Sequence, residues 1–379
     1  MLDKSALYRD TWAEIDLDAI AHNVSLARKL HPHKTLFAVV KANAYGHGDV
    51  EVALTALEAG ATYLAVSSFE EAMNLRKHGI KSPILIMGAT HPKVANLAAE
   101  HQITLTAHDE PWLQSVLDKD LASTLKIHLK VDTGMHRIGL RDGKVIEAYW
   151  RRLNDHPLIE AEGIYTHMAT ADGDPHYFRE QVARFQAILQ LIDPETVKYV
   201  HLANSATLLQ HDFSFEDGVR LGISMYGIDL GDENLPEWFK LKPTLKLYSR
   251  LVQVKLIKKG AKVGYGITYE AKNDEWIGTL SIGYADGWIR THQGRQVIVA
   301  GQECEIIGRI CMDQMMIRLP EEMAVGTKAT LIGAGMPVER VAAEMGTIPY
   351  EIFCLVGDRV PRLYMKKGKV THIKKMRSD

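Results

Sequence analysis

Short apolar runs alternate with amphipathic stretches from Trp12 to about Lys242. The apolar runs are rich in valine, isoleucine and aromatic residues, which is typical of buried β-strands. They lie at residues 36–40, 62–67, 83–87, 103–107, 125–131, 159–168 and 199–204. The pattern therefore predicts a series of buried strands with helices between them.

Helical signals fill the intervals between these runs. Apolar side chains recur at helical spacing over 50–57, and Gly60 follows as a C-cap. Ser68 and Glu71 have the spacing of a capping box, at the start of a helical pattern over 70–78. Repeated strand–helix units predict a parallel sheet, either open or closed into a (β/α)8 barrel.

Charged and polar side chains recur where the predicted strands end. In a (β/α)8 barrel these ends converge on one mouth, where active sites form. The recurrence therefore favours a barrel over an open sheet. The residues are Lys41, Arg137, His167, Asn204, Ser205 and Arg220.

The pattern changes at Pro243, where glycine, asparagine and aspartate begin to separate strand-like runs. One helical stretch, Val338–Met345, interrupts them, and 300–302 has the composition of a hairpin turn. We therefore expect an N-terminal (β/α)8 TIM-type barrel domain over 1–242 and a mostly β C-terminal domain over 243–379. The strand-like runs are 276–282, 296–300, 304–310, 315–319 and 329–332.

Composition is that of a soluble globular protein. Of the 379 residues, 46% are hydrophobic and 24% charged, with a formal net charge of −2. This balance gives no long-range attraction to nucleic acid or to an anionic membrane. No run approaches a membrane span of ~20 apolar residues, and the first ten residues lack a signal-peptide layout.

Cysteine usage points to a reducing compartment. The chain contains three cysteines with no CxxC spacing, so we expect a cytoplasmic protein without structural disulfides. No HExxH or CxxC pattern supports a metal site.

Lys41 is the most informative candidate for chemistry. It follows the apolar run 36–40, and an ammonium at the mouth of a buried strand is partly desolvated, which makes its amine nucleophilic. A Schiff-base lysine needs these properties, and Tyr45 can reach the same site across the turn. The alternative is a strand-end lysine that extends to solvent.

Other candidates have equally plain alternatives. Arg137 offers a planar fork for a carboxylate, or it pairs with Asp132. His167 is either a site residue or a satisfied core histidine. Tyr265, between two glycines, is either an exposed reactive phenol or a hairpin-turn aromatic.

A phosphate site is suggested by the last two predicted barrel strands. Ser205 is a good N-cap for a helix, and Gly222 and Ile223 follow the next strand. Loops at these positions of a barrel commonly expose backbone N–H groups to phosphate. One serine and one glycine alone would be a weak signal.

Segments 41–48, 130–139, 163–172, 201–207, 219–227 and 263–269 together resemble the alanine racemases, over both expected domains. The resemblance implies pyridoxal 5′-phosphate (PLP) held on Lys41, with Lys41 and Tyr265 as the two catalytic bases on opposite faces of the substrate. Arg220 would face the pyridine nitrogen and keep it unprotonated, because a guanidinium can donate a hydrogen bond to that nitrogen but cannot accept one from it. The further cofactor-binding residues that it implies are Tyr45, Arg137, His167, Asn204, Ser205, Gly222 and Ile223.

The resemblance also implies the substrate and the assembly. L-alanine and D-alanine would be interconverted, supplying D-alanine for peptidoglycan. Each site would join one chain's barrel to the partner's β domain in a homodimer. Lys130 matches a lysine that is carbamylated in some family members. Substrate contacts would come from Arg137, Cys311 and Met312, and the entrance would be lined by Asp172, Tyr284, Arg290 and Arg309.

One position departs from the family pattern. Several members carry tyrosine before Arg-Val-Pro, where this chain has Asp358. An unpaired carboxylate there would repel a phosphate, so Asp358 either turns to Arg359 or Arg362 or that contact is remade. Alternative functions are a broader serine or amino-acid racemase and a barrel-fold PLP decarboxylase. A PLP carrier protein is disfavoured because such carriers lack a second domain.

Overall fold

Eight short apolar strands form a closed parallel barrel in the computed structural model, which describes residues 7–230 and 235–375. Strand β2 closes the ring because Phe37 lies opposite Tyr63 of β3 on one side and Arg220 of β9 on the other. The predicted barrel is thereby confirmed. Its strands are β2 (Thr35–Val39), β3 (Tyr63–Val66), β4 (Ile84–Ile86), β5 (Ile103–Ala107), β6 (Leu125–Lys130), β7 (Ile159–Tyr165), β8 (Tyr199–His201) and β9 (Gly218–Leu221).

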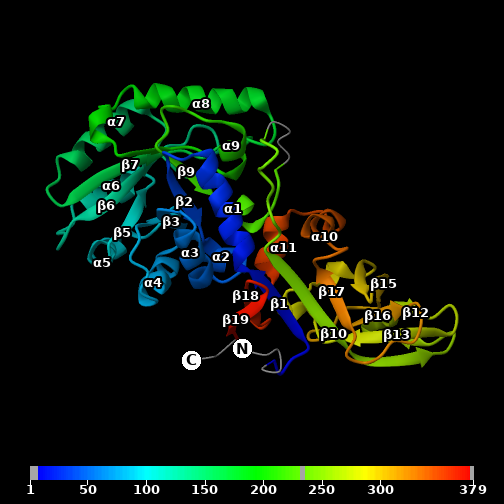
Figure 1. Cartoon of the computed structure of the whole chain (residues 1–379). Coiled ribbons are helices and arrows are strands. Elements are labelled where there is room, and N and C mark those ends of the chain that lie inside the picture. The colour runs from blue at the N-terminus through cyan, green and yellow to red at the C-terminus, as the bar shows by residue number, and fades with distance from the viewer. Residues whose placement is uncertain (1–6, 231–234, 376–379) are drawn as a thin grey trace. The chain divides into compact units, whose positions relative to one another are not determined.

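Helices surround the barrel strands (Figure 1). Their inward positions are apolar, as Ile146, Trp150 and Leu153 are in α7, and burying that stripe against the sheet stabilises both layers. The helices are α1 (Leu17–Leu30), α3 (Asp49–Glu58), α4 (Phe69–Lys77), α5 (Ala95–Glu100), α6 (Glu110–Leu117), α7 (Gly143–Asn154), α8 (Pro175–Leu189) and α9 (Ser205–Gln210).

Side chains at the helix starts explain where the helices begin. The Ser68–Glu71 capping box of α4 is confirmed, since the Glu71 N–H donates to Ser68 and the Glu71 carboxylate accepts from the Ser68 N–H at 3.2 Å. Asp109, Asp142 and Asp174 accept from first-turn N–H groups of α6, α7 and α8. These caps satisfy donors that have no partner inside the helix.

A nine-stranded sheet forms the second unit, in the order β13-β16-β15-β14-β17-β10-β1-β18-β19. Strand β1 lies inside it, antiparallel to β10 through Ala13 and Leu247 and parallel to β18 through Ala13 and Arg362. The strands are β1 (Thr11–Asp16), β10 (Leu245–Ile257), β13 (Glu275–Leu280), β14 (Gln296–Val299), β15 (Gln302–Ile307), β16 (Met315–Leu319), β17 (Lys328–Ile332), β18 (Arg362–Lys366) and β19 (Lys369–Lys374), with β11 (Lys262–Val263) and β12 (Tyr269–Glu270) as a separate hairpin.

The chain thus forms two compact units, each built from segments that are not contiguous in the sequence. We call them the barrel unit, residues 19–44, 49–230 and 235–242, and the β unit, residues 7–18, 45–48 and 243–375. A division of the chain at 242 places β1 and 45–48 with the barrel, whereas hydrogen bonds place β1 in the sheet of the β unit.

The β unit contains two helices, α10 (Val338–Met345) and α11 (Pro349–Leu355), whereas the sequence pattern predicts only the first. The missed helix begins with proline at its first position, which a strand-based interpretation treats as a break. The predicted hairpin turn is present between β14 and β15, where Ala300 and Gly301 both have positive φ.

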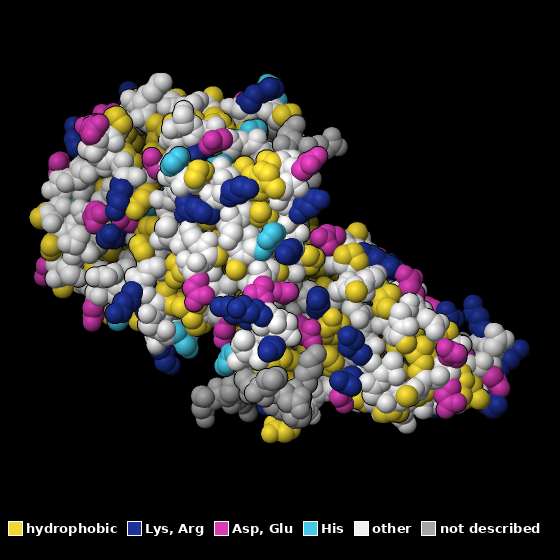
Figure 2. Space-filling view, in the orientation of Figure 1, with side chains coloured by type: hydrophobic (Ala, Val, Ile, Leu, Met, Phe, Trp, Pro, Cys, Tyr) yellow, Lys and Arg dark blue, Asp and Glu magenta, His cyan; other side chains and the backbone are white. Residues whose placement is uncertain are grey.

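Lys and Arg side chains are interspersed with Asp and Glu side chains over the face drawn in Figure 2. The described side chains on this face therefore form no broad surface of one charge. Within 7–230 and 235–375, every helix is too short or too polar to cross a membrane.

Candidate active site

A cavity of about 240 Å³ opens among residues that follow the barrel strands. Four predicted site residues line it together: Lys41 after β2, Lys130 at the end of β6, Arg137 in the loop beyond, and His167 after β7. Tyr165 forms part of its wall. The cavity thus gathers an amine, a guanidinium and an imidazole at the carboxyl ends of the strands, where barrel active sites form.

The backbone after Lys41 is left-handed. Ala42, Asn43 and Ala44 have φ near +52° and ψ near +50°, and Tyr45 also has positive φ. Each non-glycine residue in this conformation costs about 1–2 kcal/mol. Strain of this kind is concentrated at functional sites, where surrounding contacts hold it in place.

Glu71 supplies one such contact in the barrel unit. Its carboxylate accepts from the N–H of Ala42 and from the N–H of Ser67, both at 2.7 Å. The same carboxylate completes the capping box of α4. One side chain therefore ties the start of the left-handed turn to the end of β3 and the start of the next helix.

Lys130 is buried, with 4% of its surface exposed. Its amine donates to the carbonyl of Val131 at 2.6 Å and lies 5.3 Å from the centre of the Tyr165 ring. Burial, reinforced by the charges of Arg220 and Arg137, lowers the pKa of Lys130 to about 7. The amine is therefore partly neutral near physiological pH, which makes it a nucleophile.

Arg220 lies within β9 rather than beyond it, and it is fully buried. Its guanidinium donates to His201 Nδ1 at 2.7 Å, to the carbonyls of Leu202 and Thr166 at 2.9 and 3.0 Å, and faces His167 Nδ1 at 3.3 Å. Burial and then the charge of Arg220 hold the pKa of His167 well below its usual value. His167 is thus a neutral acceptor for Arg220 on its Nδ1.

The predicted phosphate residues come together after β8 and β9. Ser205 Oγ accepts from the N–H of Gly222 at 2.9 Å and lies 3.4 Å from the N–H of Ser224. Asn204, not Ser205, caps α9, because its side-chain oxygen accepts from the Thr207 N–H at 3.0 Å. Ile223 begins a 3-10 helix over Ile223–Tyr226, whose first N–H groups have no partner within that helix.

The alternative that Arg137 pairs with Asp132 is resolved in the barrel unit. Asp132 pairs with His136, at 3.0 Å between Oδ2 and Nδ1, and not with Arg137. Arg137 stays exposed at the cavity.

Asp172 lines a different hollow of about 730 Å³, beside Phe178 of α8 and His211.

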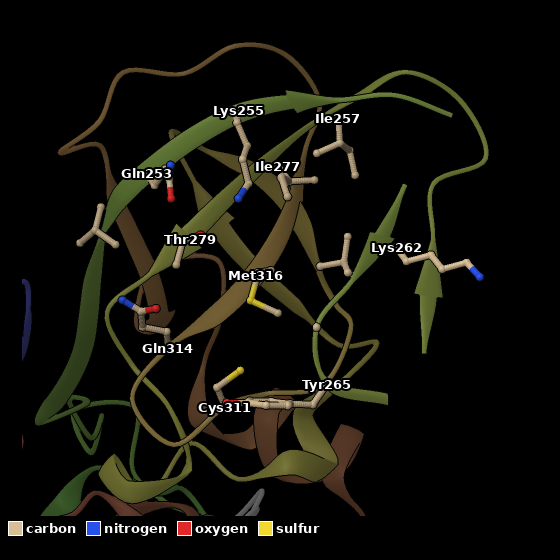
Figure 3. A pocket seen from close by; sticks show the side chains of 13 residues that line it. Gln253, Lys255, Ile257, Lys262, Tyr265, Ile277, Thr279, Cys311, Gln314 and Met316 are labelled. Atoms are coloured by element: carbon tan, nitrogen blue, oxygen red, sulfur yellow. The ribbon is translucent and has the colours of Figure 1, made fainter. Parts of the chain in front are cut away.

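Tyr265 lies in the β unit at the tip of the β11–β12 hairpin, with 73% of its surface exposed. Its two flanking glycines have φ of 75° and 71°, and a side chain at Gly266 would meet Arg309. Tyr265 and Cys311 line a pocket of about 890 Å³ with Gln314 and Met316 (Figure 3). The hairpin interpretation is right about position, and the unusual feature is the exposure of the ring.

Further apolar side chains of the β unit are exposed: Ile267 at 58%, Met312 at 53% and Tyr284 at 40%. Backbone hydrogen bonds hold the segment of Tyr284 against the segment of Met312. The Tyr284 N–H donates to the Cys311 carbonyl, and the Ala285 N–H donates to the Met312 carbonyl. Arg290 begins a nearby 3-10 helix and is exposed.

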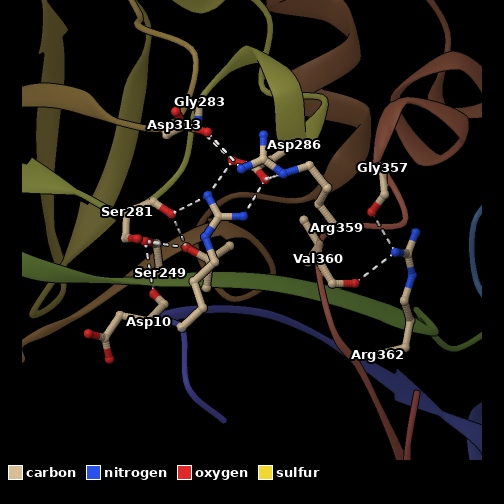
Figure 4. Close-up of polar contacts among 12 residues, drawn as sticks. Asp10, Ser249, Ser281, Gly283, Asp286, Asp313, Gly357, Arg359, Val360 and Arg362 are labelled. Atoms are coloured by element: carbon tan, nitrogen blue, oxygen red, sulfur yellow. Dashed lines mark hydrogen bonds and ion pairs between the residues drawn. The ribbon is translucent and has the colours of Figure 1, made fainter. Parts of the chain in front are cut away.

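A buried carboxylate anchors this part of the β unit. Asp286, whose side chain is inaccessible, pairs with Arg9 and lies 3.7 Å from Arg359 (Figure 4). It also accepts from the N–H of Gly283 at 2.9 Å. Asp286 thereby fixes the 3-10 helix Tyr284–Asp286 that carries Tyr284.

Tyr45 belongs to the β unit, where it is buried and its ring centre lies 5.9 Å from that of Tyr350. The next residue, Gly46, has a carbonyl that accepts from Nε and Nη2 of Arg362 at 3.1 and 3.0 Å. Asp358 lies 4.0 Å from Arg362 and is mostly exposed, so it turns toward one of the two expected arginines.

Comparison with known proteins decides the family. The model of the "Alanine racemase, N-terminal domain" family matches residues 15–229, and that of the "Alanine racemase, C-terminal domain" family matches 244–364.

The chain belongs to the alanine racemase family.

Relatives in the alanine racemase family resemble the chain over nearly its whole length. The alanine racemase of Geobacillus kaustophilus is 48% identical over 375 residues, covering 97% of each chain. Alanine racemase 1 of Bacillus subtilis is 45% identical, covering 97% of this chain and 96% of its own. The family assigns the chain to the racemases, which are isomerases.

Solved structures agree with this assignment. Alanine racemase from Bacillus anthracis, determined with bound L-Ala-P, has a TM-score of 0.92 at 44% identity and covers 97% of this chain and 98% of its own. A histidine racemase from Leuconostoc mesenteroides has a TM-score of 0.85 at 32% identity, covering 95% and 99%. The fold therefore also occurs in a racemase named for a larger amino acid.

Sequence reasoning missed the polar side chains inside the barrel. His128 and His201 are completely buried, and Glu162 is 3% exposed. A signal was present, because each of these charged or polar residues interrupts a strand that otherwise reads as apolar. Such residues are buried only where they are paired.

Proposed function

We propose that this chain interconverts L-alanine and D-alanine with PLP bound to Lys41. The observation that carries the proposal is the cavity that gathers Lys41, Lys130, Arg137 and His167, in a chain that alanine racemases match almost end to end. PLP supplies an electron-withdrawing ring that acidifies the Cα–H of a bound amino acid. The chain's residues bind, orient and exchange the proton.

The donors on the barrel suit a phosphorylated pyridine. Ser205 and the first turn at Ile223 would offer a hydroxyl and a backbone N–H to a phosphate, the chemistry that such loops provide. Gly222 would hold them together, because its N–H donates to Ser205 Oγ. Asn204 and Tyr45 complete the proposed cofactor set. Asp358 is left out because its carboxylate would repel the phosphate.

Arg220 would face the pyridine nitrogen. A guanidinium donates hydrogen bonds but accepts none, so the nitrogen keeps its lone pair and stays unprotonated. Burial lowers the pKa of Arg220 to about 10, which leaves it a cation at neutral pH. An unprotonated pyridine ring withdraws electrons more weakly than a protonated one. Negative charge at Cα would therefore be short-lived, which favours racemisation over transamination.

The tautomer of His167 supports the second base. Because Arg220 donates to its Nδ1, the neutral ring carries its proton on Nε2. That N–H would be available to the phenolic oxygen of Tyr265. Tyr265 would take the proton of L-alanine and Lys41 that of D-alanine, from opposite faces.

Arg137 and Lys130 would set the charge around the substrate. Arg137, exposed at the cavity, would bind the substrate carboxylate. The lowered pKa of Lys130 suits reaction with carbon dioxide, and a carbamate there would turn a cation into an anion that braces Arg137. Cys311 and Met312 would contact the substrate, and Asp172, Tyr284, Arg290 and Arg309 would line the entrance.

A two-fold homodimer would bring the two sets together. The exposed side chains of Tyr265, Ile267, Met312 and Tyr284 are a surface that a second protein chain would cover. We propose that this surface meets the partner's barrel mouth, and a two-fold interface then makes two identical composite sites. The reaction would take place in the cytoplasm and supply D-alanine for peptidoglycan.

The test is chiral analysis of products from purified protein given L-alanine, L-serine, L-lysine and L-histidine separately. We expect D-alanine in large excess over the other D-amino acids. Lys41→Ala should abolish turnover, while Lys81→Ala, an exposed lysine on the same unit, should leave it unchanged. Preferential racemisation of serine or histidine would replace alanine as the substrate, and carbon dioxide release would favour the decarboxylase.

A further inference from the structure

Arg220 is a buried cation without a carboxylate in direct contact among residues 7–230 and 235–375. Its hydrogen-bond partners are two backbone carbonyls and two imidazoles. A buried charge is stable only where other charges or hydrogen bonds compensate it. The nearby buried carboxylate of Glu216 supplies part of this compensation. More can come through the imidazole neighbours.

The partners of His201 determine which of its ring nitrogens donates and which accepts. Arg220 can only donate, so His201 Nδ1 accepts and the neutral ring carries its proton on Nε2. That Nε2 lies 2.9 Å from His128 Nδ1, which must then be the acceptor. The proton of His128 is consequently on its Nε2, pointing away from Arg220.

Glu162 lies at the far end of this chain of contacts. His128 Nε2 is 3.4 Å from Glu162 Oε1 and has no hydrogen-bond partner of normal geometry among the described residues. The same carboxylate accepts from Tyr63 at 2.7 Å and from Lys126 at 3.2 Å. Burial alone raises the pKa of Glu162, but His128, Tyr63 and Lys126 outweigh it and leave the pKa at about 2. Glu162 is thus an anion in the barrel interior.

Packing holds both imidazoles in place. His201 lies between the rings of Phe37 and Tyr165, with centres 4.8 and 4.7 Å away and planes tilted by 21° and 3°. Gly163 lies opposite His128 in the β6–β7 register, and a Cβ there would come within 2.6 Å of the imidazole. Burial lowers the pKa of both histidines, so neither ring becomes a second cation.

We propose that Glu162 is a second, remote counter-ion of Arg220 beside Glu216, coupled to Arg220 through His201 and His128 in fixed tautomers, and is a positioning residue of the racemase. The link to catalysis rests on the proposed function, in which Arg220 faces the pyridine nitrogen. Glu162 touches neither substrate nor cofactor. It acts by holding the charge and orientation of the guanidinium from inside the barrel.

Neutron diffraction from deuterium-exchanged crystals of the wild-type holoenzyme tests the coupling directly. We expect one deuteron on each ring, on Nε2 of His201 and on Nε2 of His128. A deuteron on His201 Nδ1, or two deuterons on either ring, would overturn the inference. This measurement needs no substitution and no turnover.

A double-mutant cycle provides a second test, on the urea unfolding of the apoprotein. Glu162→Gln should lower the midpoint strongly in wild type and clearly less in an Arg220→Met background, since non-additivity reports coupling between residues that do not touch. Glu160→Gln is the matched control: Glu160 lies 3.6 Å from the same Lys126 but is 43% exposed. Equal losses from Glu162→Gln in both backgrounds would mean that Glu162 is not coupled to Arg220.

Catalysis gives the functional readout. Glu162→Gln should lower kcat by about tenfold or more, shift the absorption maximum of bound PLP, and leave KM for alanine nearly unchanged because Arg137 lies outside the coupled chain. Glu160→Gln should change none of these. An unshifted spectrum with unchanged kcat would refute the positioning role. If the wild-type protein racemises nothing, the proposed function fails, while the neutron and stability measurements still decide the coupling.

Discussion

Asp286→Asn should destabilise the β unit and identify the contact that fixes its exposed site residues. Asp286 is inaccessible to solvent, and both of its oxygens face the guanidinium of Arg9, with Nη2 at 2.6 Å from Oδ2. Asparagine keeps the shape of the side chain but removes the charge. The substitution therefore leaves Arg9 without its partner and presents an N–H₂ group to an N–H donor.

Removal of one partner from a buried ion pair typically costs 3–5 kcal/mol, because the other charge is left uncompensated. Arg9 is 24% exposed, so water screens part of that loss. We expect about 2–4 kcal/mol of lost unfolding free energy. At about 2–4 °C for each kcal/mol, the apparent Tm should fall by about 5–15 °C.

Thermal unfolding followed by circular dichroism would measure this change. Asp313→Asn is the matched control, because Asp313 pairs with Arg359 at 2.7 Å but is 56% exposed. An exposed pair contributes at most about 1 kcal/mol. Equal shifts for the two variants would refute the argument that burial of Asp286 makes its pairing with Arg9 important.

Three other predictions concern the site itself. In Tyr265→Phe, exchange of the Cα hydrogen with solvent deuterium, followed by NMR, should fall far more for L-alanine than for D-alanine; equal losses would show that Tyr265 is not a stereospecific base. Inactive Lys41→Ala and Tyr265→Ala chains, co-expressed with separate tags, should form mixed dimers that recover up to about half of wild-type activity, since one of two independent sites is intact; mixed dimers as inactive as their parents, with PLP still bound, would place Tyr265 in its own chain's site. Carbon-13 bicarbonate should give a carbamate NMR signal that Lys130→Arg abolishes, and the signal should grow as pH rises through about 7, where the buried amine loses its proton; a signal that persists in Lys130→Arg would move the carbamate elsewhere.

The barrel could be predicted because its strands are short apolar runs that need no long-range information. Residues 103–107 of the barrel match the observed strand β5 at both ends, and in the β unit residues 315–319 match β16 in the same way. The clustering of Lys41, Arg137 and His167 could also be predicted from the sequence, because the carboxyl ends of parallel strands in a barrel converge. Motif resemblance added the roles that residue type alone left open.

Other features depend on tertiary contacts that no local pattern encodes. The left-handed turn over 42–45 runs against the intrinsic preference of alanine and tyrosine, and contacts such as that of Glu71 with the Ala42 N–H hold it. The N-cap of α9 is Asn204 because its side chain, and not that of Ser205, reaches the Thr207 N–H. The coupling of Glu162 to Arg220 joins residues on two different strands, so it is visible only in the folded barrel.

The position of β1 has a consequence for synthesis. Its sheet partners, β10 and β18, lie more than two hundred residues later in the chain, so β1 leaves the ribosome long before either can pair with it. Until then its backbone donors and acceptors are exposed to other chains, a known route to aggregation. A barrel fragment cut at residue 242 would keep that strand permanently unsatisfied. Expression of the barrel alone should therefore begin after β1.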